Sequence, residues 1–325
     1  MEAVFLKVLN MSLSASAVIL VILALRLLLR RAPKKWAYAL WSAAAFRLCC
    51  PWSFEAAFSV FSLQSARRVV GSASLPATEL EYIPPDIGMM AEPRVNLVTP
   101  GLSEAVSATL PAATPQASAN PLQIWICIGA VVWCAGMAAL LLYSIVSYAR
   151  LRRRVDGAVL LEGNVYETDR VRAPFILGLI RPRIYLPLGL EGEALDYVLA
   201  HERYHIRRRD YLVKAFAFAL LTLHWLNPLV WLAFRLMGKD MEMSCDEQVL
   251  GARENIRKAY SSTLLSFATG ERFPAASPLA FGETGVKTRI KNALRWKKPK
   301  AWVTIAAAAV CLAAVAACAA NLEYS

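Results

Sequence analysis

The sequence predicts a mostly α-helical membrane protein with four transmembrane helices and one cytoplasmic α+β domain. Of its 325 residues, 57% are hydrophobic and 18% are charged, which is more apolar than a typical soluble chain. The apolar residues gather into long runs, and clusters of basic residues flank these runs. One segment of domain size lies between the last two runs. These observations together predict the fold class.

Four apolar runs are long enough, or nearly so, to cross a bilayer, a distance of about 30 Å that takes about 20 helical residues. They cover residues 4–29, 36–52, 122–147 and 301–320. Positive charges follow the first run and do not precede it, so we expect a membrane anchor and not a cleavable signal peptide. Arg26 and Arg47 lie near the ends of two runs, where we expect their side chains to snorkel to the interface.

The basic residues indicate the orientation of these runs. The clusters are Arg30, Arg31, Lys34 and Lys35, then Arg150, Arg152, Arg153 and Arg154, then Lys297, Lys298 and Lys300. Lys and Arg beside a span favour the cytoplasmic side, so the N-terminus is expected outside. The net charge of +12 is explained by these flanks. No nucleic-acid-binding pattern accompanies it, so the expected partner is the lipid bilayer and not DNA or RNA.

Five segments follow from this topology. Residues 1–52 hold transmembrane helices 1 and 2 with a short basic cytoplasmic loop, and residues 53–121 form an extracytoplasmic loop. Residues 122–149 form transmembrane helix 3, residues 150–300 the cytoplasmic domain, and residues 301–325 transmembrane helix 4 with a short tail. The Pro, Ala, Ser and Thr content of the external loop predicts a largely irregular connector. A sensor of an external signal is the alternative.

The cytoplasmic segment begins with strand patterns and continues with helical ones. The stretches AVLLE and VYETD flank Gly163-Asn164, a dipeptide typical of a hairpin, and RIYLP has the alternation of a strand. From about Glu191 the pattern becomes helical. Residues 211–237 are apolar, but Asn227-Pro228 divides them into two short halves. We prefer a helix–turn–helix core that abuts the lipid; a segment that enters the membrane and returns is the alternative.

The segment His201-Glu202-Arg203-Tyr204-His205 is an HExxH motif in this helical pattern. Residues four apart lie on one face of a helix, so the two imidazoles can bind one zinc ion. Glu202 is then placed to act as the general base that activates a water molecule. The chain has three histidines, and two of them fall in this motif, which favours a zinc site over a solvated helix face.

A catalytic zinc ion usually has a third protein ligand. The candidates are His224, Asp210, Glu242, Asp246 and Glu247. Glu242 and Asp246 are spaced four residues apart, so one carboxylate could bind the metal while the other orients a ligand imidazole. The pattern favours Glu242 modestly. His224 lies in the apolar run and is expected to be an interior histidine.

Several stretches resemble the BlaR/MecR-type antirepressor metallopeptidases, bacterial membrane proteins with a gluzincin-like zinc site. They are APFILGLIRPRIYLP, LAHERYHIRRRDYLVK, HWLNPLVWLAFRLMGKDMEMSCDEQVL and FGETGVKTRIKNAL. The resemblance implies a zincin-like fold for the cytoplasmic domain, with His201, His205 and Glu242 as zinc ligands. It makes Glu202 the general base and Asp246 the partner of a ligand. Asp210 is similar in position to another motif acid.

The resemblance also implies a mechanism in which an external signal activates the cytoplasmic zinc domain. That domain would then cleave a cytoplasmic regulatory protein, such as a transcriptional repressor, or the chain itself near its last span. The strand RIYLP could hold an extended substrate as an added edge strand. The basic stretch 287–300 matches the self-cleavage region, although a cytoplasmic flank explains its charge equally.

The well-known antibiotic receptors carry an external penicillin-binding sensor domain after the fourth span. No S-x-x-K motif follows the last run here, so β-lactam sensing has no support in this sequence. A short member without that domain and a chain truncated before it are the two alternatives. The alternative function is a non-catalytic membrane signal transducer that keeps the peptidase fold as a binding module. A transporter is a weaker third option. Glu202 discriminates between the first two, because hydrolysis needs this carboxylate and metal binding does not.

Overall fold

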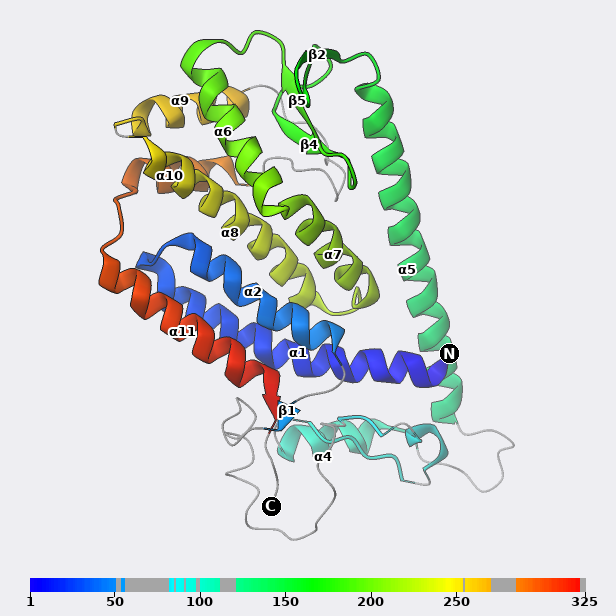
Figure 1. Cartoon of the computed structure of the whole chain (residues 1–325). Helices are drawn as coiled ribbons and strands as arrows, with labels where there is room; N and C mark the ends of the chain where they lie inside the picture. The colour runs from blue at the N-terminus through cyan, green and yellow to red at the C-terminus, as the bar shows by residue number, and fades with distance from the viewer. Residues whose placement is uncertain are drawn as a thin grey trace.

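The structure is a computed structural model, and most of its described part is helical, with one small sheet (Figure 1). It describes residues 1–50, 54–55, 82–84, 86–90, 92–97, 100–111, 121–253, 255–269 and 285–321. Most of the external loop predicted to be irregular therefore lies outside the described residues. The described part of that loop includes helix α4 (Pro100–Thr109), which the sequence analysis did not predict.

All four apolar runs are helical. They form α1 (Glu2–Leu28), α2 (Lys34–Cys49), α5 (Pro121–Arg154) and α11 (Ala301–Ala319). Two segments of the described chain, residues 2–31 and 121–154, are long and apolar enough to cross a membrane. The apolar part of α11, residues 301–316, is shorter. The structure thus supports two candidate membrane helices, and the number four stays a prediction.

Short elements follow or contact these helices. A 3-10 turn, η1 (Leu29–Arg31), follows α1, and a second, η2 (Ile87–Met89), packs against α5. Strands β1 (Phe54–Glu55) and β6 (Ala320–Asn321) pair in parallel. The Asn10 side chain in α1 accepts from the Ile83 main-chain N at 3.0 Å and donates to its carbonyl at 2.9 Å. The described part of the segment predicted to be external is therefore tied to α1.

The predicted hairpin is confirmed within a four-stranded sheet of order β2-β3-β5-β4. The strands are β2 (Val159–Glu162), β3 (Val165–Thr168), β4 (Phe175–Leu177) and β5 (Arg183–Pro187). Gly163 has a φ of 55°, a conformation that glycine adopts without strain. The predicted strand RIYLP is β5, but β5 lies between β3 and β4. The expectation that β5 is an edge strand was therefore wrong, because the chain returns to place β4 outside it.

Five helices complete the domain. They are α6 (Gly192–Arg208), α7 (Asp210–Leu223), α8 (Pro228–Ala252), α9 (Arg257–Thr269) and α10 (Val286–Arg295). The predicted break at Asn227-Pro228 is confirmed as the turn between α7 and α8. The Asn227 side chain accepts from the Leu229 N–H at 2.9 Å, and Pro228 occupies the first turn, as is typical of a helix start.

The tip of the α7–α8 hairpin reaches the middle of α1. The Asn227 amide donates to the Ser12 and Ser16 hydroxyls of α1 at 2.8 and 2.7 Å. The sequence analysis preferred a core that only abuts the lipid. The observed contacts place the tip beside the middle of α1, a candidate membrane helix, and both alternatives for this segment stay predictions.

The main core lies where these helices meet. Figure 1 shows α1, α2 and α11 side by side below α7 and α8, with α6 and the sheet above them and α5 along one side. Ile22 of α1, Leu40 of α2 and Met241 of α8 are at most 1% exposed and belong to one cluster. Burial of such side chains stabilises the fold by roughly 1.5–3 kcal/mol each. Helix α8 therefore lies between the apolar helices and α6.

An ion pair joins α1 to α8 in this core. The Arg26 guanidinium donates to both oxygens of Asp240 at 2.7 and 2.8 Å, and the Trp41 indole N–H donates to Asp240 at 3.0 Å. Asp240 is 1% exposed. The snorkelling predicted for Arg26 was therefore wrong, because a buried carboxylate offers a stronger partner than the interface. Arg47 is also buried, at 5% exposure.

Replacing Arg26 by Ala leaves Asp240 buried without its cation, which costs about 3–5 kcal/mol for pairs of this kind. We expect a lower melting temperature for Arg26→Ala in detergent-solubilised protein. Arg30→Ala is the matched control, since Arg30 is exposed and lies one turn further along the chain. Equal melting temperatures for both variants would contradict the structural role of the pair.

Candidate metal centre

The HExxH motif lies on α6 as predicted, and its two imidazoles are buried against α8. His201 is 5% exposed and His205 is 1% exposed. Their Nε2 atoms are 3.1 Å apart, because residues four apart project from the same face of a helix. Two nitrogen donors therefore face the same point.

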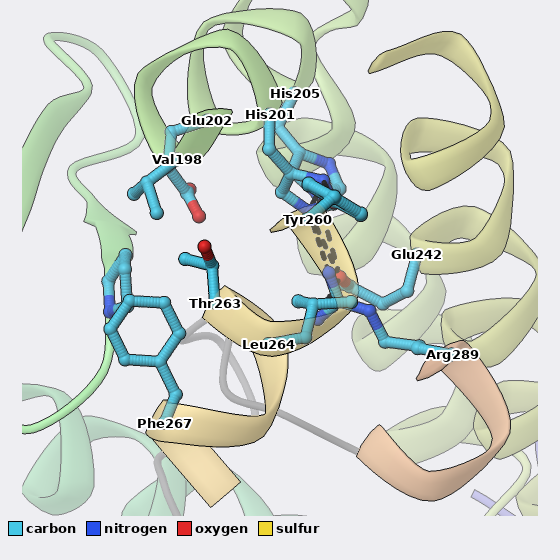
Figure 2. Close-up of a pocket in the computed structure, with 11 residues that line it drawn as sticks. Val198, His201, Glu202, His205, Glu242, Tyr260, Thr263, Leu264, Phe267 and Arg289 are labelled. Atoms are coloured by element: carbon cyan, nitrogen blue, oxygen red, sulfur yellow. Dashed lines mark hydrogen bonds and ion pairs between the residues drawn. The ribbon is translucent and has the colours of Figure 1, made fainter. Parts of the chain in front are cut away.

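Glu242 of α8 approaches both imidazoles. Its Oε2 atom is 3.4 Å from His201 Nε2 and 3.7 Å from His205 Nε2. The three side chains offer ligand atoms that all lie within 4.8 Å of one another. Figure 2 shows the imidazoles above and Glu242 below, at one side of the pocket. The structure thus brings together the three residues predicted to bind zinc; their role as ligands stays a prediction.

Asp246 and Tyr260 hold the His201 ring from its other nitrogen. His201 Nδ1 lies 3.3 Å from Asp246 Oδ1 and 3.1 Å from the Tyr260 hydroxyl. That hydroxyl donates to Asp246 at 2.6 Å. Such partners favour the tautomer with the proton on Nδ1, which leaves the Nε2 lone pair directed at a metal. Asp246 is therefore placed as the partner of a ligand, as the resemblance implies.

Asp210 holds His205 in the same way. Its Oδ2 atom lies 2.7 Å from His205 Nδ1, and the Arg208 guanidinium donates to both Asp210 oxygens at 2.7 and 2.6 Å. Burial would raise the pKa of Asp210, but the hydrogen bonds from His205 and Arg208 lower it below its ordinary value. The negative charge of Asp210 thus orients the second imidazole. The sequence left the role of Asp210 open, and the structure places it against the His205 ring.

His205, Asp210 and Cys245 form a second group of possible ligand atoms. The Cys245 sulfur is 3.4 Å from His205 Nδ1, but that nitrogen already bonds to Asp210. Burial raises the pKa of the Cys245 thiol to about 11, which disfavours the thiolate that metal binding requires. The group of His201, His205 and Glu242 is therefore the better metal site.

Glu202 faces the pocket with an unpaired oxygen. Its side chain is 7% exposed, and Oε2 has no hydrogen-bond partner among the residues that the structure describes. Burial raises the pKa of Glu202. Figure 2 shows its carboxylate directed toward the Thr263 hydroxyl across the pocket. An unpaired buried carboxylate oxygen is costly, so this position suits a group that receives a proton from a bound reactant.

The pocket itself is small and largely apolar. It has a volume of about 40 Å³. Besides the four motif and ligand residues it is lined by Pro174, Val198, Tyr260, Thr263, Leu264, Phe267 and Arg289. His201, His205, Glu242 and Arg289 gather on one side of the pocket, and Glu202 lies across from them near Val198 and Phe267 (Figure 2).

The two remaining ligand candidates lie elsewhere. His224 is 2% exposed, and its Nε2 donates to the Leu48 carbonyl at 3.0 Å, so it is the interior histidine that was expected. Glu247 accepts from the Lys34 main-chain N–H at 2.8 Å and from Asn292 at 3.4 Å. Neither belongs to the groups of metal-ligating atoms found in the described part of the chain.

The sequence analysis did not single out Arg289, Tyr260 or Lys214. Arg289 lies in the quoted stretch FGETGVKTRIKNAL, so the resemblance contained a signal for it. Lys214 of α7 is within electrostatic reach of the acids at the site. Burial lowers its pKa to about 8, while the negative charges of Glu242 and Glu202 oppose this shift.

The donor set fits a zinc ion. Two imidazole nitrogens and one carboxylate oxygen are the ligands of many catalytic zinc sites, which keep a further position open. Burial would raise the pKa of Glu242, but the positive charges of His205 and Arg289 lower it well below its ordinary value. A charged carboxylate and the unpaired oxygen of Glu202 thus face the same pocket.

The chain is similar to known proteins along most of its length. The family model described as BlaR1 peptidase M56 matches residues 6–293. The Regulatory protein BlaR1 of Bacillus licheniformis is 30% identical to the chain over 135 residues. That alignment covers 39% of this chain and 22% of the relative, so the chain spans well under two thirds of that protein's length. The family match includes every element that carries a candidate ligand.

Replacing Glu242 by Ala removes one of the three donors. We expect this variant to bind zinc more weakly by at least the roughly 10–100-fold that is lost when only a partner of a ligand is changed. Cys245→Ser is the control and should keep the wild-type affinity. Competition titration with a chromophoric chelator measures both. The reverse result, with Cys245→Ser weakened and Glu242→Ala unchanged, would move the site to the second group.

Proposed function

The chain belongs to the BlaR1 peptidase M56 family, and on this premise we propose that it is an integral-membrane zinc endopeptidase. It hydrolyses a peptide bond in a cytoplasmic regulatory protein, such as a transcriptional repressor, or in itself, as part of transmembrane signalling. One observation carries the proposal: His201, His205 and Glu242 converge on one point beside the unpaired oxygen of Glu202.

In this proposal His201, His205 and Glu242 hold the zinc ion. Asp246 and Asp210 fix the two imidazole rings through their Nδ1 atoms. A bound zinc ion polarises a carbonyl group and makes a water molecule more acidic. The chain's own contribution is to hold the three donors in place so that the geometry needs no rearrangement when substrate arrives.

Glu202 is the proposed general base. It accepts the proton of the attacking water and passes it to the amine that leaves the scissile bond. Proton transfer is efficient when the pKa of the base approaches the working pH. Burial raises the pKa of Glu202 in that direction, and its oxygen faces the pocket without a competing partner in the described structure.

The substrate is proposed to bind in an extended form along β4. This strand is an edge of the four-stranded sheet, and Pro174, immediately before it, lines the pocket. An extended peptide adds to an edge strand through main-chain hydrogen bonds. Val198 and Phe267 line the same pocket, so an apolar side chain next to the scissile bond is favoured.

The alternative is a non-catalytic transducer that uses the domain for binding. The environment of Glu202 argues against it. A buried carboxylate oxygen without a partner lowers stability, and a binding module gains nothing from it. A hydrolase gains a base that is ready to accept a proton.

Glu202→Gln keeps the shape of the side chain and removes its basicity. We expect this variant to bind zinc like the wild type and to lose cleavage by at least the roughly 10²–10⁴-fold that general-base catalysis contributes. N-terminal peptide mapping of cells that express each form reveals substrates as fragments present only with the wild type. Fragments of equal abundance in both cell lines would refute the role of Glu202.

We further propose that the zinc domain faces the cytoplasm, with the N-terminus outside. Single cysteines placed in a chain whose own cysteines are replaced test this orientation. Ile180→Cys, at a site that is 93% exposed, should react with a membrane-impermeant thiol reagent only after permeabilisation. Glu104→Cys, on the exposed surface of α4, should react in intact cells. The opposite labelling pattern would invert the topology.

A further inference from the structure

Arg289 brings a fixed positive charge into the candidate metal centre from a separate helix. It lies on α10, which packs against α8 and α9, and it is 4% exposed. Its Nε and Nη2 atoms donate to the two oxygens of Asp246 at 2.9 and 2.7 Å. The guanidinium is therefore held in place by a two-point ion pair with the partner of His201.

The same guanidinium also reaches two candidate ligand atoms. Arg289 Nη1 lies 3.3 Å from Glu242 Oε2, and Nη2 lies 3.4 Å from His201 Nε2. Glu242 Oε2 is also the oxygen that faces both imidazoles. Any ion that these residues bind would therefore share Glu242 Oε2 and the lone pair of His201 Nε2 with Arg289.

This sharing has a definite electrostatic consequence. An arginine side chain does not lose its proton in proteins, so its charge opposes a divalent cation at the neighbouring donors. The site is buried, which weakens the screening of this repulsion by water. At the same time the guanidinium stabilises the negative charge of Glu242 and Asp246.

We infer that Arg289 is a positioning residue that holds Glu242 and Asp246 ready for the metal and limits how tightly the metal binds. This inference rests on the proposed zinc site, but it does not depend on peptidase activity. It assigns Arg289 a role beyond ligand support: removing its charge tightens zinc binding and destabilises the metal-free protein.

Zinc affinity and thermal unfolding of the full-length protein in detergent test the inference. Arg289→Gln removes the charge and keeps an N–H donor for Asp246. We expect its zinc dissociation constant to fall by roughly tenfold, because a repulsion between two positive charges a few ångströms apart is removed from a buried site. Its melting temperature without zinc should fall, and the rise on adding zinc should exceed that of the wild type. Lys291→Gln, an exposed charge on α10, should change neither quantity.

A second comparison separates the repulsion between Arg289 and the metal ion from the loss of the Arg289–Asp246 ion pair. It also tests the inference if Arg289→Gln does not fold. Asp246→Asn is compared with the double variant Asp246→Asn/Arg289→Gln, so that residue 246 is constant. The double variant should bind zinc more tightly. Equal or weaker binding in the double variant would overturn the inference. Absence of zinc binding by the wild type would instead overturn the proposed function.

Discussion

The structure depends on a constraint that burial imposes on charge: three acids inside the helical core each have an arginine beside them. Asp246 has Arg289, Asp210 has Arg208, and Asp240 has Arg26. A buried ion pair that loses one partner leaves an uncompensated charge. The helices that supply these residues are therefore fixed relative to one another more strictly than apolar packing alone would require. The candidate metal centre is built on that fixed arrangement.

Helix α8 connects the Arg26–Asp240 ion pair to the candidate metal centre. Asp240 and Glu242 are two residues apart, so they project from nearly opposite sides of the helix, whereas Glu242 and Asp246 share one side. Asp240 accordingly faces Arg26 of α1, while Glu242 and Asp246 face the imidazoles and Arg289. On the other flank, α10 is followed by α11 after only the short segment 296–300. The centre is thus linked on two sides to apolar helices.

Local pattern explains what the sequence could predict. The HExxH motif, the four-residue spacing of Glu242 and Asp246, and the hairpin at Gly163 are all short-range features, and the geometry of a helix or a turn determines their outcome. The structure agrees with each of these placements. Metal binding itself stays a prediction.

Long-range pairing explains what the sequence could not predict. Arg289 is 88 residues from His201, and it lies in a basic stretch whose charge a cytoplasmic flank explains equally. Arg26 resembled a snorkelling residue because its partner, Asp240, is 214 residues away. The position of β5 depends on which strand pairs outside it, which its own alternation does not encode. In each case the missing information was the identity of a distant partner.

The turn between α7 and α8 also depends on hydrogen bonds from other side chains. A turn beside the middle of a membrane helix must satisfy its main-chain polar groups within the protein, since lipid offers no hydrogen bonds. Two indoles do so here: Trp133 donates to the Leu223 carbonyl and Trp231 donates to the Trp225 carbonyl. The Trp225 indole in turn donates to the Trp133 carbonyl of α5. With these carbonyls satisfied, α7 and α8 can form a hairpin (Figure 1). His205 before the hairpin and Glu242 after it therefore remain on one side, and the motif and its distant carboxylate meet.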